Sequence, residues 1–80
     1  MAIEEIRAML PGMFYRRPSP DAPPYKETGD AVSKGDVIGL IEVMKSFHEV
    51  RCEVDGKIVA FEVEDASAIT PGAVLAEVET

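Results

Sequence analysis

A weak internal repeat limits what this chain of 80 residues can fold into. The segment Lys34–Glu42 (KGDVIGLIE) aligns with Pro71–Glu79 (PGAVLAEVE), and upstream of these Pro11-Gly12 aligns with Asp55-Gly56. Neither half is large enough to bury an apolar face by itself, so the two halves must pack against each other. We therefore predict an all-β fold, a flattened barrel or sandwich of two small antiparallel sheets with quasi-twofold symmetry.

The distribution of Val, Ile and turn residues supports this fold class. Short runs rich in Val and Ile predict strands at residues 37–43, 47–54, 58–63 and 74–78. Within 47–54, Val50, Cys52 and Val54 recur at period two, which buries one face of a strand. The first ten residues fit either a helix or a strand, since the apolar residues from Ile3 to Leu10 have helical spacing. We favour a strand near Met9, because Pro11 and Gly12 would stop a helix there.

Three turns are predicted from glycine-containing segments. Asp55-Gly56 is a signal for a tight hairpin, Pro71-Gly72 fits the central pair of a type II turn, and Lys34–Asp36 is a third turn. The link between the two halves contains Val43–Ser46 and should lie on or near the twofold axis. Lys45 is therefore expected at the tip of a hairpin.

Charge and composition exclude several function classes. The net charge of −7 and the absence of a basic stripe argue against nucleic acid as a partner. The single cysteine, Cys52, allows no internal disulfide, which suits the cytoplasm, and one histidine with one cysteine makes a structural zinc or other metal site improbable. Because no apolar run approaches the roughly 20 residues that span a bilayer, no membrane association is expected. Glu4 and Glu5 stand where a signal peptide would carry basic residues, so we predict no targeting segment.

The two halves differ by an insertion. Gly12 and Gly35 are 23 positions apart (35 − 12), whereas Gly56 and Gly72 are 16 apart (72 − 56), so the first half carries about seven extra residues. They are located in Arg17–Pro24, which holds four of the six prolines. Composition alone predicts a stiff loop there.

Two motifs resemble a known family. Glu42-Val43-Met44-Lys45 resembles the biotinyl attachment motif, usually Glu-Ala-Met-Lys-Met, whereas the sister lipoyl motif usually has Asp before its lysine. Gly12–Ala22 (GMFYRRPSPDA) is similar to the segment that leads into the protruding thumb of bacterial biotin carboxyl carrier proteins of acetyl-CoA carboxylase. The resemblance implies the hammerhead barrel of biotinyl and lipoyl domains. Residues 1–80 then form a single biotinyl carrier domain, with its core at 9–79 and a thumb-like loop at 17–24.

The resemblance also implies a function. A biotin ligase would attach biotin covalently to Lys45, and the domain would act as a swinging arm. It would carry carboxybiotin from a biotin carboxylase subunit to a carboxyltransferase subunit of acetyl-CoA carboxylase or a related acyl-CoA carboxylase. The chain itself would be a non-catalytic carrier component of that complex, since biotin does the chemistry and the protein supplies its position.

The same resemblance names the residues around the cofactor. Met44 is expected to be recognised by the ligase, and Glu42 is either a ligase contact or an ordinary acid at a strand end. Ser46 stands where the family usually has methionine. In the thumb-like loop, Ser19, Pro20 and Asp21 are the candidate contacts to biotin, as family thumbs contact the bound cofactor.

Two other functions stay open at the level of the sequence. The chain could be a lipoyl carrier domain of an acyl-transfer complex, which the unusual Ser46 leaves possible and the thumb segment opposes. It could also be an unmodified interaction module that kept the fold, as the altered residues around Lys45 suggest.

Overall fold

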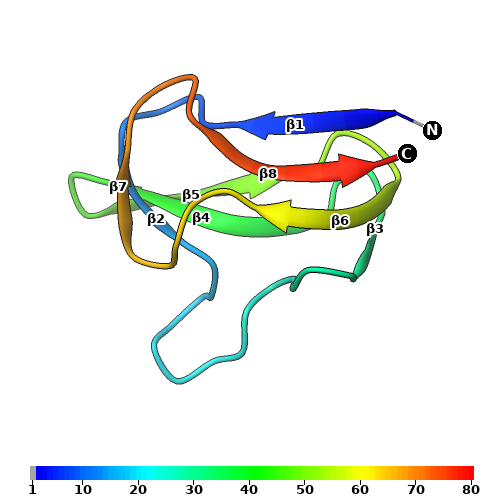
Figure 1. Cartoon of the computed structure of the whole chain (residues 1–80). Coiled ribbons are helices and arrows are strands. Elements are labelled where there is room, and N and C mark those ends of the chain that lie inside the picture. Colours follow the sequence, from blue (N-terminus) through cyan, green and yellow to red (C-terminus); the bar gives the residue numbers. More distant parts are fainter. Residues whose placement is uncertain (1) are drawn as a thin grey trace.

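The computed structural model describes residues 2–80, which contain eight strands in two four-stranded antiparallel sheets (Figure 1). One sheet has the strand order β1-β8-β6-β3 and the other has the order β5-β4-β2-β7. The strands are β1 (Ile3–Arg7), β2 (Gly12–Tyr15), β3 (Ala31–Val32), β4 (Val37–Val43), β5 (Ser46–Arg51), β6 (Gly56–Phe61), β7 (Ser67–Ile69) and β8 (Val74–Glu79). The predicted all-β class is confirmed, and the body is flattened, with extents of 37 × 27 × 20 Å. Within residues 2–80 no helix is long and apolar enough to cross a lipid bilayer.

The two sheets have the same construction, which confirms the quasi-twofold symmetry. Each strand of one sheet has a counterpart at the same place in the other: β1 corresponds to β5, β8 to β4, β6 to β2 and β3 to β7. A Cβ atom built on Gly12 would lie 2.2 Å from the carbonyl oxygen of Glu42, and one built on Gly56 would lie 2.3 Å from that of Glu79. The aligned glycines thus occupy equivalent places, where the backbones approach too closely for any side chain.

Equivalent turns precede the central strands β4 and β8. In Ser33–Asp36 and in Thr70–Ala73 the fourth N–H donates to the first carbonyl, at 2.9 and 3.1 Å. The third residues, Gly35 and Gly72, have φ of +95° and +89°. A positive φ at that position defines a type II turn and favours glycine. The turns predicted at Lys34–Asp36 and Pro71-Gly72 are therefore confirmed.

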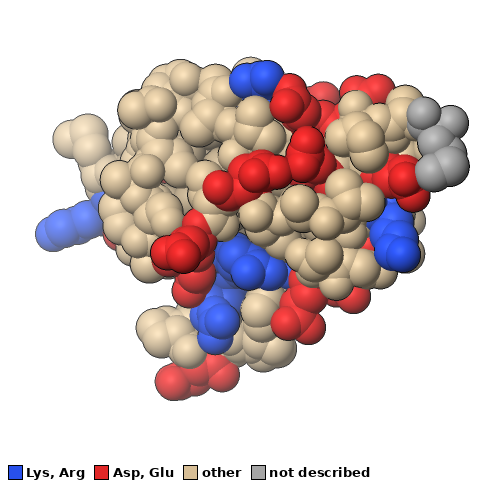
Figure 2. Space-filling view, viewed as in Figure 1, with Lys and Arg blue, Asp and Glu red and all other residues tan. Residues whose placement is uncertain are grey.

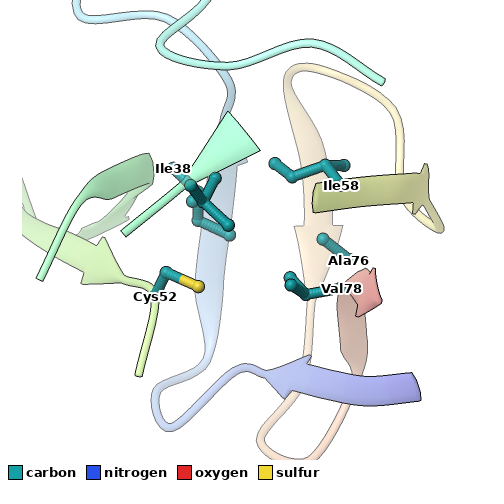
Figure 3. Close-up of a cluster of buried hydrophobic side chains, with 6 residues drawn as sticks. Ile38, Cys52, Ile58, Ala76 and Val78 are labelled. Atoms are coloured by element: carbon teal, nitrogen blue, oxygen red, sulfur yellow. The ribbon is translucent and has the colours of Figure 1, made fainter. Parts of the chain in front are cut away.

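The hydrophobic core fills the space between the sheets in two clusters. In the first cluster, Ile38 and Cys52 face Ile58, Ala76 and Val78 across the sandwich (Figure 3). The alternation predicted within 47–54 is confirmed, since Cys52 is 1% exposed and Val50 and Val54 pack against this cluster. The second cluster consists of Ala8, Phe14, Ile41, Ile69 and Leu75. The core therefore joins both halves of the chain, as the repeat requires.

The prediction of a strand near Met9 is wrong. Met9 and Leu10 lie in a bend, and the side chain of Met9 is 85% exposed. Because β1 and β2 belong to different sheets, the chain must cross between the sheets here and cannot stay extended along one of them. Ala8 holds the crossing in place, since its N–H donates to Ala73 and its carbonyl accepts from Gly72, both at 2.8 Å. The barrel also includes β1, upstream of the core assigned to residues 9–79.

The tight hairpin predicted at Asp55-Gly56 is wrong as well. β5 ends at Arg51, before the predicted end at residue 54, and β6 begins at Gly56. The two strands pair with different neighbours, β5 with β4 and β6 with β3 and β8. Gly56 is needed for the close approach of Glu79, and Asp55 Oδ1 accepts a hydrogen bond from the backbone N–H of Lys34 at 2.7 Å. The dipeptide thus ends a crossing between sheets.

The β4–β5 turn lies at the opposite end of the molecule from the start of β1 and the end of β8 (Figure 1). At the end where β1 starts, the N–H of Thr80 donates to the carbonyl of Ala2 at 2.9 Å, so β1 and β8 meet where a hairpin would stand in the second half. Between β2 and β3 the chain makes a long excursion away from the barrel (Figure 1). This excursion contains the predicted insertion at 17–24.

Candidate functional site

The turn between β4 and β5 has two residues, Met44 and Lys45. The strands pair up to Val43 and Ser46, which face each other across the ladder. Both turn residues are left-handed, with φ of +49° for Met44 and +68° for Lys45. Positive φ at both central positions is the type I′ hairpin, whose twist matches that of the strands and which prefers Asn and Gly. Left-handed φ costs about 1 kcal/mol or more for each residue with a Cβ.

This strained turn projects its side chains into solvent. Met44 is 94% exposed and Lys45 is exposed. In the space-filling view a basic side chain stands out at the end where the β4–β5 turn lies (Figure 2). Strain that persists at an exposed turn suggests that these two side chains have a role beyond folding. The hairpin tip predicted for Lys45 is confirmed.

A pocket of about 410 Å³ lies beside the base of this hairpin. Glu42 and Phe47, which pair across the ladder, form part of its wall. Tyr15 donates a hydrogen bond to Glu42 Oε1 at 3.2 Å, and its ring lies 6.3 Å from that of Phe47, tilted by 52°. Partial burial raises the pKa of the Tyr15 hydroxyl, and the hydrogen bond to Glu42 raises it further. Tyr15 therefore stays a neutral donor.

The loop between β2 and β3 forms the far wall of this pocket through Arg17, Pro18, Ser19 and Pro20. Asp65, in the turn before β7, holds the start of the loop. Its Oδ1 accepts from the backbone N–H of Arg16 at 2.8 Å, and its Oδ2 pairs with Nε of Arg17 at 3.5 Å. The guanidinium of Arg16 stacks on the ring of Phe61 at 4.0 Å. The loop is thus anchored at its base on the β6–β7 turn.

The structure brings together some of the residues predicted from the sequence. Glu42, Ser19 and Pro20 line the pocket, and Met44 and Lys45 form the turn beside it. Ser46 closes the turn opposite Val43, and Asp21 is exposed on the loop, and neither lines the pocket. The sequence analysis missed the side chains of Tyr15, Phe47, Asp65 and Ala66, which also line it. Counting outward from a two-residue turn would have found Phe47 opposite Glu42, but no local signal marks Asp65.

Relatives of this chain share one description. A biotin carboxyl carrier protein of acetyl-CoA carboxylase from Glycine max chloroplasts is 35% identical over 69 residues, which cover 86% of this chain and 26% of that protein. Proteins with the same description from Pyropia yezoensis and Streptococcus pyogenes are 35% and 37% identical, over 94% and 84% of this chain and 48% and 40% of their own lengths. The chain therefore spans between a quarter and a half of the length of these relatives.

Solved structures share the fold. Kluyveromyces lactis urea carboxylase superposes on 99% of this chain with a TM-score of 0.79 and 22% identity, over 6% of its own length. An aspartoacylase family protein from Mesorhizobium loti covers 90% of the chain, and 23% of its own, with a TM-score of 0.71 and 21% identity. At these identities the comparison shows a common barrel.

The family model described as biotin-requiring enzyme matches residues 4–78, which include all the strands from β2 to β7, the strained turn and the anchored loop. This match covers nearly the whole chain. On this match and the identities to carrier proteins, the chain belongs to the biotin-requiring enzyme family.

Proposed function

We propose that this chain is the biotin carrier domain of a biotin-dependent carboxylase and that biotin is attached to Nζ of Lys45. The observation that carries the proposal is the left-handed Met44-Lys45 turn at the exposed end of the barrel. Two-residue type I′ turns prefer Asn and Gly, so retaining Met and Lys there is explained if both side chains are needed. Relatives described as biotin carboxyl carrier proteins support the choice of biotin.

The chain's own residues do three things in this role. Lys45 supplies a primary amine on a long stem. Its nitrogen bonds to the activated carboxyl carbon of biotin, while the group that activated this carboxyl leaves and the ligase takes up the proton of the amine. The β4–β5 ladder holds this stem away from the body. Biotin would supply a ureido nitrogen that accepts and releases a carboxyl group. None of these tasks needs a catalytic group on the carrier, so we assign the chain a non-catalytic role.

The pocket beside the hairpin fits the size and chemistry of such a cofactor. Its volume of about 410 Å³ lies within the roughly 300–1,000 Å³ of small-molecule sites. Tyr15, Phe47 and Pro20 give it apolar walls, while Glu42 and Ser19 add polar atoms. We propose Ser19 and Pro20 as contacts to the cofactor, and Asp21 as a loop residue outside them.

The partners follow from the carrier role. We propose that a biotin ligase recognises the exposed Met44 and that biotin carboxylase and carboxyltransferase subunits then visit Lys45. The descriptions of the relatives make acetyl-CoA carboxylase the proposed complex. A cytoplasmic location is part of the proposal, because the single cysteine suits a reducing compartment.

Intact mass and peptide mapping test the proposal directly. The chain is produced with biotin and an active biotin ligase, as the parent protein and as Lys45→Arg. One biotinyl increment on the parent, mapped to Lys45 and absent from Lys45→Arg, is expected. Lys34→Arg is the matched control, since Lys34 is also an exposed lysine in a turn, and this variant should be modified fully.

Other outcomes contradict the proposal. A lipoyl increment, in cells that contain lipoate ligase, would assign the chain to an acyl-transfer complex. An unmodified parent protein with an intact fold would favour the interaction module. Modification that persists in Lys45→Arg would move the site to another lysine.

A further inference from the structure

A second concave surface lies on the flank of the barrel, away from the lysine. It is a groove of about 460 Å³ between β1 and β5, each of which is the edge strand of its sheet. Its lining comes from residues 4–7, 9 and 10 and from residues 48–51, 53 and 54, together with Ile41. These two sets are equivalent in the repeat. Adding 44 to each residue number of the first set gives the residue number in the second, and the same offset relates Gly12 to Gly56. The groove therefore lies on the quasi-twofold axis, and Lys45 is not part of it.

The walls of the groove are suited to an additional strand. Alternate backbone N–H and C=O groups of an edge strand point away from its sheet, and within residues 2–80 no strand pairs with the outer edges of β1 and β5. Ile6 and Val50, which line the groove, are half-buried and pack on the core. An extended segment could bond to one edge and place apolar side chains on this floor.

The groove has an apolar end. Met9 stands at the position equivalent to Glu53, and Met9 and Leu10 are 85% and 36% exposed. Since β1 begins beside the chain termini and β5 begins at the Lys45 turn, the residues that follow β1 lie toward the Lys45 end of the groove and those that follow β5 toward the terminal end (Figure 1). The large apolar side chains thus gather at the Lys45 end.

The terminal end of the groove is acidic. Arg7 and Arg51 are already engaged, Arg7 with Glu5 and the carbonyl of Gly72, and Arg51 in the equivalent way with Glu49 and Gly35. Glu4 and Glu53 have no ion-pair partner among residues 2–80. These two carboxylates lie at the end opposite to Met9. The groove therefore has a negatively charged end and an apolar end.

We propose that this groove docks one extended segment of a partner protein, with a large apolar side chain at the Lys45 end and lysine or arginine side chains at the terminal end. A second copy of this chain fits less well, because it would bring a net charge of −7 against the same carboxylates. Docking here leaves Lys45 accessible, so a partner could hold the domain while the lysine visits other proteins.

Titration of the 15N-labelled chain with the peptide acetyl-Leu-Thr-Val-Thr-Lys-Lys-amide tests the proposal. Amide shifts are expected along β1 and β5, including Ile6 and Val50, and not at the Lys45 turn. Glu53→Lys should weaken binding about tenfold, the effect of one charge-assisted hydrogen bond. Glu27→Lys makes the same change of charge on the β2–β3 loop. It should leave the affinity within about twofold, because salt screens an exposed charge that is distant from the groove.

Several results would overturn it. No shift in the groove at millimolar peptide, or shifts confined to the Lys45 turn or the loop, would reject the site. An equal loss with Glu27→Lys, or equal binding of a peptide with Glu in place of both lysines, would indicate unspecific attraction to an acidic protein. Concentration-dependent shifts of β1 and β5 without peptide would show that a second copy occupies the groove. The spectrum of each variant reports whether it is folded.

Discussion

The two halves of this barrel are built from the same parts and differ where function is proposed. Arg7 and Arg51 make equivalent bonds to Gly72 and Gly35, so the repeat extends through the edge strands. The halves differ at the link, which is the Met44-Lys45 turn in one place and a backbone hydrogen bond between Thr80 and Ala2 in the other. They differ also in the loop before β3 and in the acidic and apolar ends of the groove. Symmetry stabilises the scaffold, and departures from it create the sites.

The strongest test of the equivalence is at the two glycines of close approach. Gly12→Ala and Gly56→Ala should each cost about 3 kcal/mol or more, because the clash is with a backbone carbonyl and exceeds ordinary overpacking. A domain of this size has roughly 5 kcal/mol in total, so the double variant should be unfolded. Urea denaturation followed by circular dichroism measures both.

Gly29→Ala provides the control for this comparison. Gly29 has a positive φ of +97°, as Gly12 has one of +154°, but a Cβ on Gly29 meets nothing within 4 Å. Its cost should stay near the roughly 1–2 kcal/mol of a left-handed residue. If either Gly12→Ala or Gly56→Ala were as mild as this, the two halves would not share the close approach.

A second test exchanges core volume between the halves. A Cβ on Gly39 would lie 2.6 Å from the ring of Phe14 and 2.7 Å from the carbonyl oxygen of Tyr15. The pair equivalent to Gly39 and Phe14 in the other half is Ala76 with Ile58, both fully buried. Gly39→Ala alone should cost about 2 kcal/mol. Combined with Phe14→Ile it should cost at least about 1 kcal/mol less than the sum of the single changes, because the clash with the ring is removed and only the clash with the Tyr15 carbonyl stays.

A double-mutant cycle in urea measures this coupling. The reverse exchange, Ile58→Phe with Ala76→Gly, should show coupling of the same sign. Additive free energies in both halves would mean that the large and small residues do not compensate each other across the axis.

The sequence predicted most of the scaffold, because the signals there are local. β4 was predicted with its exact bounds, since an apolar run is followed directly by a turn. The alternation around Cys52 and the positions of the two turns were equally readable, and the type II conformation was predicted for Pro71-Gly72. β3 and β7, of two and three residues, are too short to show a period. Asp55-Gly56 misled because a dipeptide predicts a local turn, whereas the partner of the next strand is decided by distant residues.

The site was predicted unevenly for the same reason. Lys45 and Glu42 stood out through the motif, and the pairing of Glu42 with Phe47 follows from the two-residue turn. The anchoring of the loop could not be foreseen, because Asp65 is 49 residues from Arg16 and the contact needs the barrel to be closed. Residues that touch through tertiary structure alone leave no spacing to detect.

A third test removes the strain at the one link that has no counterpart. Met44→Asn with Lys45→Gly should stabilise the domain by about 1 kcal/mol, because both residues accept left-handed φ. Thermal unfolding should show the gain, and the variant should lose modification. Ala66→Gly relieves a single φ of +60° outside the tip and should give a smaller gain of the same sign. A loss of stability at the tip would mean that Met44 or Lys45 supports the barrel.

The smallest expected effect distinguishes the two type II turns by pH. Asp36 Oδ2 accepts from the N–H of Ser33 at 2.9 Å and pairs with Lys26 at 3.3 Å, whereas the equivalent residue in the other turn is Ala73. The hydrogen bond from Ser33, and then Lys26, hold the pKa of Asp36 below the ordinary value of 3.8. A carboxyl whose pKa is lowered by folding stabilises the folded state above its unfolded pKa, and this contribution is lost as the pH falls through the folded value.

Asp36→Ala should therefore lower the urea midpoint at pH 7, and the difference from the parent should shrink steadily below about pH 4. Asp21→Ala removes the same charge from an exposed part of the loop and is the matched control, with little expected change at either pH. A deficit in Asp36→Ala that is equally large in acid would assign the effect to lost packing. A deficit that fades in acid would show that the first turn depends on an ionised side chain which the second turn replaces by Ala73, packed against the core.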